Sequence, residues 1–189
     1  MSLTCFFSNH TSVVGIADQR KYRMNPDGTM ESFSDDGYKL FQISPDFIVS
    51  VIGEVSSLVK AFVKKLQEEK LDYRQGIEAL EKFYEVFREP LSKHKCCLTF
   101  GGIVDGIPHL MTTSTIGFKT RAYKGNEMFI LAGPPDYNPD AWLTTIFENG
   151  DHDFQNLTEM AKNLIDHTSK NSVFVSPTYD LFTLGGERL

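Results

Sequence analysis

The amino-terminal part of the chain combines short apolar runs with turn-forming residues, a pattern typical of β-strands. The runs predict strands over residues 3–7, 12–18, 39–43 and 47–52. Residues 8–11 are typical of a turn, so the first two strands are expected to form a hairpin. A turn-rich excursion over residues 24–37 separates this hairpin from a second one.

Apolar spacing then changes to three and four residues, which predicts two amphipathic helices. The first carries its apolar face from Val55 to Leu66, and the second from Ile77 to Leu91, with Pro90 in its last turn. Strands are predicted next over residues 96–104, 108–113, 115–123 and 127–132. Helical patterns over 139–148 and 157–168 and short apolar runs over 172–176 and 180–184 complete the chain.

Strands in blocks and helices in pairs favour antiparallel sheets with helices layered on them over alternating βαβ units. Two sheets face to face, with a helix pair outside each, would bury every apolar face that the pattern predicts. The predicted fold class is therefore α+β, a four-layer αββα sandwich with two antiparallel sheets between helix pairs. At 189 residues, a single domain over residues 1–189 is expected.

Composition argues against several kinds of partner and site. The net charge of −6, without a broad basic face, argues against nucleic acid. The chain has neither a signal peptide nor an apolar run long enough to span a bilayer, so no membrane partner is expected. Cys5, Cys96 and Cys97 lack ligand spacing, so no disulfide and no metal site is predicted, and a reducing, cytoplasmic location is expected. Gly101-Gly102 opens no phosphate-binding pattern, and no cofactor is predicted.

Several segments resemble subunits of the proteasome family in their order and spacing. Val13–Arg20 is similar to the family's second strand, a buried run that closes in an acidic residue, with an arginine after one intervening position. Tyr38–Ile43 is similar to the third strand, which opens with the family's catalytic lysine, and Gly53 matches the glycine before its first long helix. Phe100–Leu110 looks like the family's Gly-Gly-Ile/Val hairpin, and Ala132-Gly133 matches the turn before its third helix.

The resemblance implies the αββα fold of the N-terminal-nucleophile (Ntn) hydrolases, in the proteasome β-type or HslV-type branch. In that superfamily the first residue of the mature chain attacks a carbonyl, and a nearby amine takes its proton. A lysine lowers the local pKa, and an acidic residue orients the lysine. These two roles fall on Lys39 and Asp18, and Gly53 falls on the substrate-binding or oxyanion position.

Two residues are candidates for the nucleophile. Counting back from Asp18 at the family's spacing ends on Ser2, and Met1 before a small serine is a good substrate for methionine removal. Thr4 is the alternative if the native chain begins there, because a shift of two residues keeps the strand face unchanged. Near the last strands, where the family has an aspartate, this chain has Asn171 followed by Ser172, which are expected to support the site without its charge.

Three functions follow from the resemblance. The first is a threonine- or serine-type peptidase that cleaves a peptide or other amide substrate inside a homo-oligomeric ring, with an ATPase as a further partner. The second is a non-catalytic assembly subunit, favoured by Asn171 and by the Ala132–Pro135 turn, where the family has a serine. The third is an amidase for small molecules on the same fold. The sequence does not decide between peptide and non-peptide amides.

Overall fold

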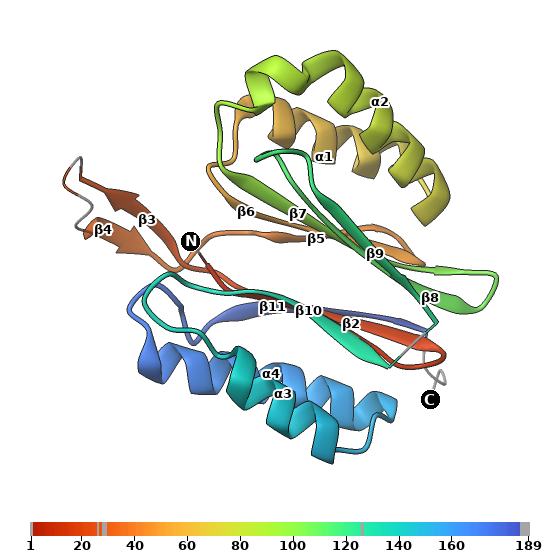
Figure 1. Ribbon diagram of the computed structural model, residues 1–189, viewed down its shortest axis with the longest axis vertical. Coiled ribbons are helices and arrows are strands. Elements are labelled where there is room, and N and C mark those ends of the chain that lie inside the picture. The colour runs from red at the N-terminus through yellow and green to blue at the C-terminus, as the bar shows by residue number, and fades with distance from the viewer. Residues whose placement is uncertain (1, 26, 28–29, 126, 186–189) are drawn as a thin grey trace.

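The computed structural model describes residues 2–25, 27, 30–125 and 127–185. Met1 and part of the predicted turn over residues 25–28 lie outside these described residues. Figure 1 shows two sheets that lie against each other, with one pair of helices beyond each sheet. The α+β class, the antiparallel sheets and the four helices are as the sequence predicts.

The first sheet has four strands in the order β10-β1-β2-β11. Its strands are β1 (Thr4–Ser8), β2 (Ser12–Asp18), β10 (Met128–Ala132) and β11 (Tyr179–Gly185). Every pairing is antiparallel, with Thr4 opposite Ala17 on one side and Ala132 on the other. All residues of β1 and β2 are buried, so the amino-terminal hairpin forms the centre of this sheet.

The second sheet has five antiparallel strands in the order β5-β6-β7-β8-β9. Its strands are β5 (Leu40–Ser44), β6 (Phe47–Gly53), β7 (Cys96–Val104), β8 (Ile107–Ser114) and β9 (Thr120–Lys124). The edge strand β9 is mostly exposed, and the central strands β6 and β7 are mostly buried. The start of β5 lies beside the end of β6, because Val51 donates its N–H to the Lys39 carbonyl at 2.8 Å.

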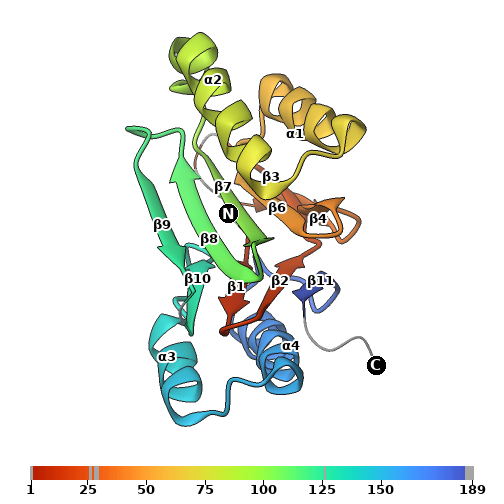
Figure 2. The same cartoon turned by 90° about the vertical axis from the view of Figure 1, so that its right-hand side faces the viewer.

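Each helix pair covers one sheet. The helices α1 (Ser57–Glu69) and α2 (Tyr73–Leu91) bury Phe62, Leu66 and Phe83 against the five-stranded sheet. The helices α3 (Asp140–Asn149) and α4 (Phe154–Asn171) bury Leu143 and Leu164 against the four-stranded sheet. A third cluster between the sheets contains Phe6, Val13, Ile48, Leu110 and Leu184. Figure 2 shows the two helix pairs at opposite ends of the molecule.

Local chemistry explains where the helices begin. The side chains of Ser56, Asp72 and Asp153 cap α1, α2 and α4, and at α2 the Gln75 side chain completes a capping box. Pro90 lies in the last turn of α2, as predicted, after a kink at Phe87. No helix among the described residues is both long and apolar enough to cross a membrane.

Three local predictions are wrong. The excursion over residues 24–37 contains strands, because β3 (Lys21–Met24) pairs with β4 (Met30–Ser34) in a separate two-stranded hairpin. This hairpin extends away from the two sheets (Figure 1). The predicted strand over 115–123 is shortened to β9, because residues 115–118 form a turn. The apolar run over 172–176 pairs with no strand, although Val175 is buried in the core of the four-stranded sheet.

Candidate functional site

The carboxylate of Asp18, at the end of β2, is the centre of the candidate site. It is fully buried, and each of its oxygens accepts two hydrogen bonds. Oδ1 accepts from the Leu3 N–H at 2.8 Å and the Lys39 Nζ at 2.9 Å. Oδ2 accepts from the N–H groups of Arg20 at 2.8 Å and Ser176 at 3.3 Å. One side chain therefore fixes the start of β1, the loop after β2, the start of β5 and the segment before β11.

Lys39 lies immediately before β5, and its side chain is only 9% exposed. Burial lowers its pKa from the ordinary value of 10.5, because the charged ammonium loses water. The adjacent Asp18 carboxylate opposes this shift, and the charge of Arg20 adds to it. The bond to Asp18 orients the Lys39 ammonium, whose positive charge would favour the ionised form of a hydroxyl placed beside it.

A second ion pair closes the site on its outer side. The Arg20 guanidinium makes two hydrogen bonds with Asp35, from Nε to Oδ1 at 2.8 Å and from Nη2 to Oδ2 at 2.9 Å. Its Nη1 donates to the Val173 carbonyl at 2.7 Å, and the group lies 4.1 Å from the centre of the Phe33 ring. The hydrogen bond from Arg20 lowers the pKa of Asp35. Arg20 thus ties the hairpin β3–β4 to the segment after α4.

The two nucleophile candidates occupy different environments. Ser2 is 5% exposed and lies one residue before Leu3, whose N–H binds Asp18. The hydroxyl of Thr4 is engaged inside the core, because it lies 3.1 Å from the Ile16 carbonyl and 3.1 Å from the Ser50 hydroxyl. Thr4 is also paired with strands on both sides. Ser2 is therefore the neighbour in the chain of the residue that binds Asp18, whereas the Thr4 hydroxyl is bonded inside the core.

Gly53 ends β6 with a φ of +99°, in the region of backbone space that favours glycine. A Cβ there would lie 2.1 Å from the Lys95 carbonyl oxygen. Gly53 is two residues beyond Val51, which is bonded to Lys39 across the strand pair. Two residues of strand span about 7 Å, so the Gly53 backbone belongs to the same end of the sheet as Lys39.

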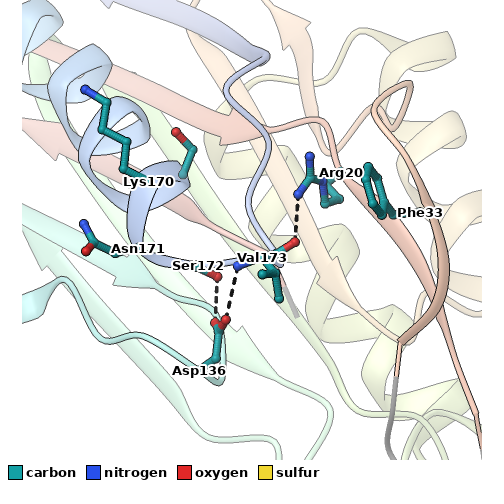
Figure 3. Close-up of a pocket in the computed structure, with 8 residues that line it drawn as sticks. Arg20, Phe33, Asp136, Lys170, Asn171, Ser172 and Val173 are labelled. Atoms are coloured by element: carbon teal, nitrogen blue, oxygen red, sulfur yellow. Dashed lines mark hydrogen bonds between the residues drawn. The ribbon is translucent and has the colours of Figure 1, made fainter.

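Asn171 and Ser172 do not bind Asp18 or Lys39. The Asn171 amide donates to the His167 carbonyl of its own helix at 2.8 Å, and its side chain is exposed. The Ser172 hydroxyl donates to Asp136 Oδ1 at 2.6 Å. Figure 3 shows both residues around an open pocket, with Asp136 on one side and Arg20 on the other. They support the shape of this pocket, and Arg20 connects it to the Asp18 site.

Ser176 is a site residue that sequence reasoning missed. It is fully buried, its N–H binds Asp18, and its hydroxyl lies 2.6 Å from the hydroxyl of Thr178. The contact with Asp18 joins positions separated by 158 residues. Only the expectation that the last strand lies beside β2 would have pointed to this segment, and the sequence pattern does not contain that pairing.

No family model and no curated protein matches the sequence. The relatives of this fold are therefore found by comparing the whole structure with solved structures. Eukaryotic HslV from Trypanosoma brucei superposes with a TM-score of 0.69 and 14% identity, covering 97% of this chain and 99% of that one. The chain has a proteasome/HslV-type Ntn-hydrolase-like fold. The family resemblance read from the sequence is confirmed at the level of the fold.

Two further solved structures of this fold are Anbu proteins, described as ancestral β-subunits. Anbu from Yersinia bercovieri has a TM-score of 0.69 and 18% identity, and covers 97% of this chain and 81% of its own. Anbu from Pseudomonas aeruginosa, solved as a helical assembly, has a TM-score of 0.70 and 14% identity, with the same coverage. At such identities the likeness concerns the fold alone, so the function has to be argued from the site.

Proposed function

We propose that this chain is a proteasome-like Ntn hydrolase that cleaves amide bonds with Ser2 as its nucleophile. The observation that carries the proposal is the position of the Asp18 carboxylate. It binds the N–H of Leu3, next to Ser2, and the ammonium of Lys39 through the same oxygen. The candidate nucleophile and the candidate activating lysine are therefore held beside a single fixed charge.

The chemistry follows from these positions once Ser2 is the first residue. The Ser2 hydroxyl attacks the amide carbon and passes its proton to its own α-amine, while the charge of the Lys39 ammonium favours ionisation of the hydroxyl. The proton then goes to the departing nitrogen as the C–N bond breaks, and water hydrolyses the resulting ester. Asp18 orients Lys39, and the Gly53 N–H is the proposed donor to the developing oxyanion. Asn171 and Ser172 act only by shaping the segment that leads to Ser176.

The architecture supports this reading as one domain over residues 1–189, with the layers of a four-layer αββα sandwich. We propose a homo-oligomer, on the model of the helical assembly of the P. aeruginosa Anbu complex. Peptides in a cytoplasmic chamber are the proposed substrates, and an ATPase partner is proposed with them. A chain that is a monomer in solution would favour small amides as substrates.

The test begins with the intact mass of the chain made from its native start codon without added residues. Loss of Met1 is expected, and turnover of fluorogenic peptide amides should then appear. Ser2→Ala and Lys39→Ala should each abolish turnover while the oligomeric state is kept. Thr4→Val is the matched control, because it removes a hydroxyl two residues further along the chain. Turnover that survives Ser2→Ala but is lost in Thr4→Val would move the nucleophile to Thr4.

A non-catalytic assembly subunit is the second candidate, and one observation favours it. Both oxygens of Asp18 are fully engaged by donors of the chain, which is also what a purely structural buried carboxylate requires. This candidate expects assembly without turnover, with Met1 retained. It fails if the chain hydrolyses amides and Lys39→Ala stops the reaction without changing the assembly.

A further inference from the structure

His152 lies in the short connection between α3 and α4, at the end of the molecule away from Lys39 along the strands. Its ring nitrogen Nδ1 is 2.8 Å from Glu127 Oε2, and Nε2 is 2.5 Å from the Phe147 carbonyl oxygen. The ring also stacks on the Phe147 ring, with centres 4.2 Å apart and planes inclined by 23°. The imidazole is thus held on both of its edges and on one face.

Both polar partners of the ring are acceptors. An ionised carboxylate and a backbone carbonyl carry no proton, so each bond needs an N–H on the imidazole. Neutral imidazole has one N–H, and only the doubly protonated ring satisfies Glu127 and Phe147 together. The Phe147 carbonyl belongs to the last turn of α3, where it also accepts the Gly150 N–H at 3.4 Å and where the helix dipole favours a cation. The geometry therefore selects the charged form of His152.

The charges around the ring agree with this assignment. Glu127 comes from the turn before β10, and its second oxygen lies 3.5 Å from Nε2 of His10 in the turn between β1 and β2. Asp151, next to His152 in the chain, adds a further negative charge. Burial opposes the charged ring, but the bonds to Glu127 and Phe147 outweigh burial and raise the pKa of His152 above 6.5.

The backbone of His152 reaches a third segment. Its carbonyl accepts from the Asn9 side-chain amide at 2.8 Å, and the Asn9 oxygen in turn accepts from the N–H groups of Thr11 and Ser12. Asn9 thereby orders the β1–β2 turn while it binds the helix connection. The end of α3, the β1–β2 turn and the turn before β10 all meet at this one histidine.

We propose that His152, Glu127 and the Phe147 carbonyl form a proton-operated clasp that fastens the α3–α4 connection to the ends of β1, β2 and β10. The clasp is closed when the ring carries both protons. Loss of one proton removes the histidine donor from either the carboxylate or the carbonyl, and the connection is held less tightly. This device does not depend on the proposed hydrolase activity.

The sign of the pH dependence follows from the raised pKa. A histidine whose pKa is higher in the folded chain stabilises the fold fully below its unfolded pKa, near 6.5. That stability is lost as pH rises through the folded pKa. The unfolding equilibrium constant should therefore increase about tenfold for each unit that separates the two pKa values, and level off above the higher one.

The experiment uses the full chain labelled for NMR, with the His152 ring signal followed from pH 5 to pH 9. A titration midpoint above the ordinary value of 6.5 is expected, together with faster amide hydrogen exchange over residues 148–154 once the midpoint is passed. Urea unfolding of the wild type, His152→Gln and the matched control His94→Gln across the same range gives the second readout. His152→Gln should lose the extra stability at low pH, and His94→Gln should keep it.

Either of two results would overturn the clasp. One is a His152 midpoint at or below 6.5 in the wild-type chain. The other is an unchanged pH dependence of unfolding in His152→Gln. The wild-type titration needs no substitution, so it decides the question even where the glutamine variant fails to fold.

Discussion

At the scale of single residues, substituting Asp18 and substituting Lys39 should lower the free energy of unfolding by different amounts. Asp18→Asn leaves a buried ammonium without its counter-charge, and removing one partner of such a pair costs about 3–5 kcal/mol of unfolding free energy. Lys39→Met leaves a carboxylate that still accepts three backbone N–H bonds, so its cost should be smaller, about 2 kcal/mol. Urea unfolding at neutral pH measures both. Equal losses would show that the backbone donors do not sustain the Asp18 charge.

Gly53 offers a second residue-scale prediction, because the chain provides a control with a similar backbone angle. Gly53→Ala places a Cβ against the Lys95 carbonyl at a φ of +99°. Gly106 has a φ of +76°, and a Cβ there meets nothing within 4 Å. Gly106→Ala should cost only the strain of a left-handed residue, about 1–2 kcal/mol. Thermal or urea unfolding should show a clearly larger loss for Gly53→Ala, and a smaller one would contradict the close approach.

The residues of the candidate site differ in how far the sequence could place them. Asp18 and Lys39 come from the ends of recognisable strands, so a family resemblance was enough to pair them. Ser176 and Asp35 lie in segments without periodicity, and their positions depend on how β11 and the β3–β4 hairpin dock. Such contacts are set by packing between distant segments, which the local pattern of a single sequence does not contain.

At the scale of elements, the capping box of α2 predicts a measurable effect of one side chain. Asp72 accepts the Gln75 N–H at 2.9 Å, and the Gln75 side chain accepts the Asp72 N–H at 3.0 Å. Asp72→Ala leaves the Gln75 N–H without its side-chain acceptor and should cost about 1 kcal/mol. Glu81→Ala, exposed in the middle of the same helix, is the control and should stay within about 0.5 kcal/mol of wild type. Similar losses in both variants would mean that the box does not stabilise α2.

Elements with a strong apolar periodicity were predictable from the sequence. Elements stabilised by contacts with other segments were not. The apolar faces of α1 and α2 repeat over several turns, so their place in the chain followed from the sequence. In the described part of the chain, the hairpin β3–β4 has no sheet partner beyond its own two strands. It is held by Arg20 over Phe33 and by Tyr22 against Phe174, with ring centres 5.1 Å apart. Two-stranded hairpins are only marginally stable alone, so the composition of this segment could not predict the hairpin.

At the scale of the whole molecule, two glycines allow the sheets to approach each other. A Cβ on Gly15 would lie 2.6 Å from Ile48 Cδ1 of the opposite sheet. A Cβ on Gly101 would lie 2.7 Å from Cδ1 of Phe6. The Phe6 ring is fully buried in the cluster between the sheets. The sequence predicts two sheets, but their separation depends on these residue-to-residue fits, which appear only in the folded chain.

Because Gly101 packs directly against Phe6, the stability effects of substituting these two residues should be coupled. Gly101→Ala forces a methyl group into the Phe6 ring and should cost about 1–3 kcal/mol by overpacking. Phe6→Leu replaces the same ring with a smaller side chain and should cost about 1–2 kcal/mol by itself, because it leaves a small cavity. In the double variant the new methyl fills part of that space. Its loss should fall short of the sum by at least about 0.5 kcal/mol, as measured by urea unfolding of all four chains.

Gly106→Ala with Phe6→Leu is the control pair and should be additive, since Gly106 has open space around it. Additive losses in both pairs would mean that the two sheets do not meet at Phe6 and Gly101 in the folded chain.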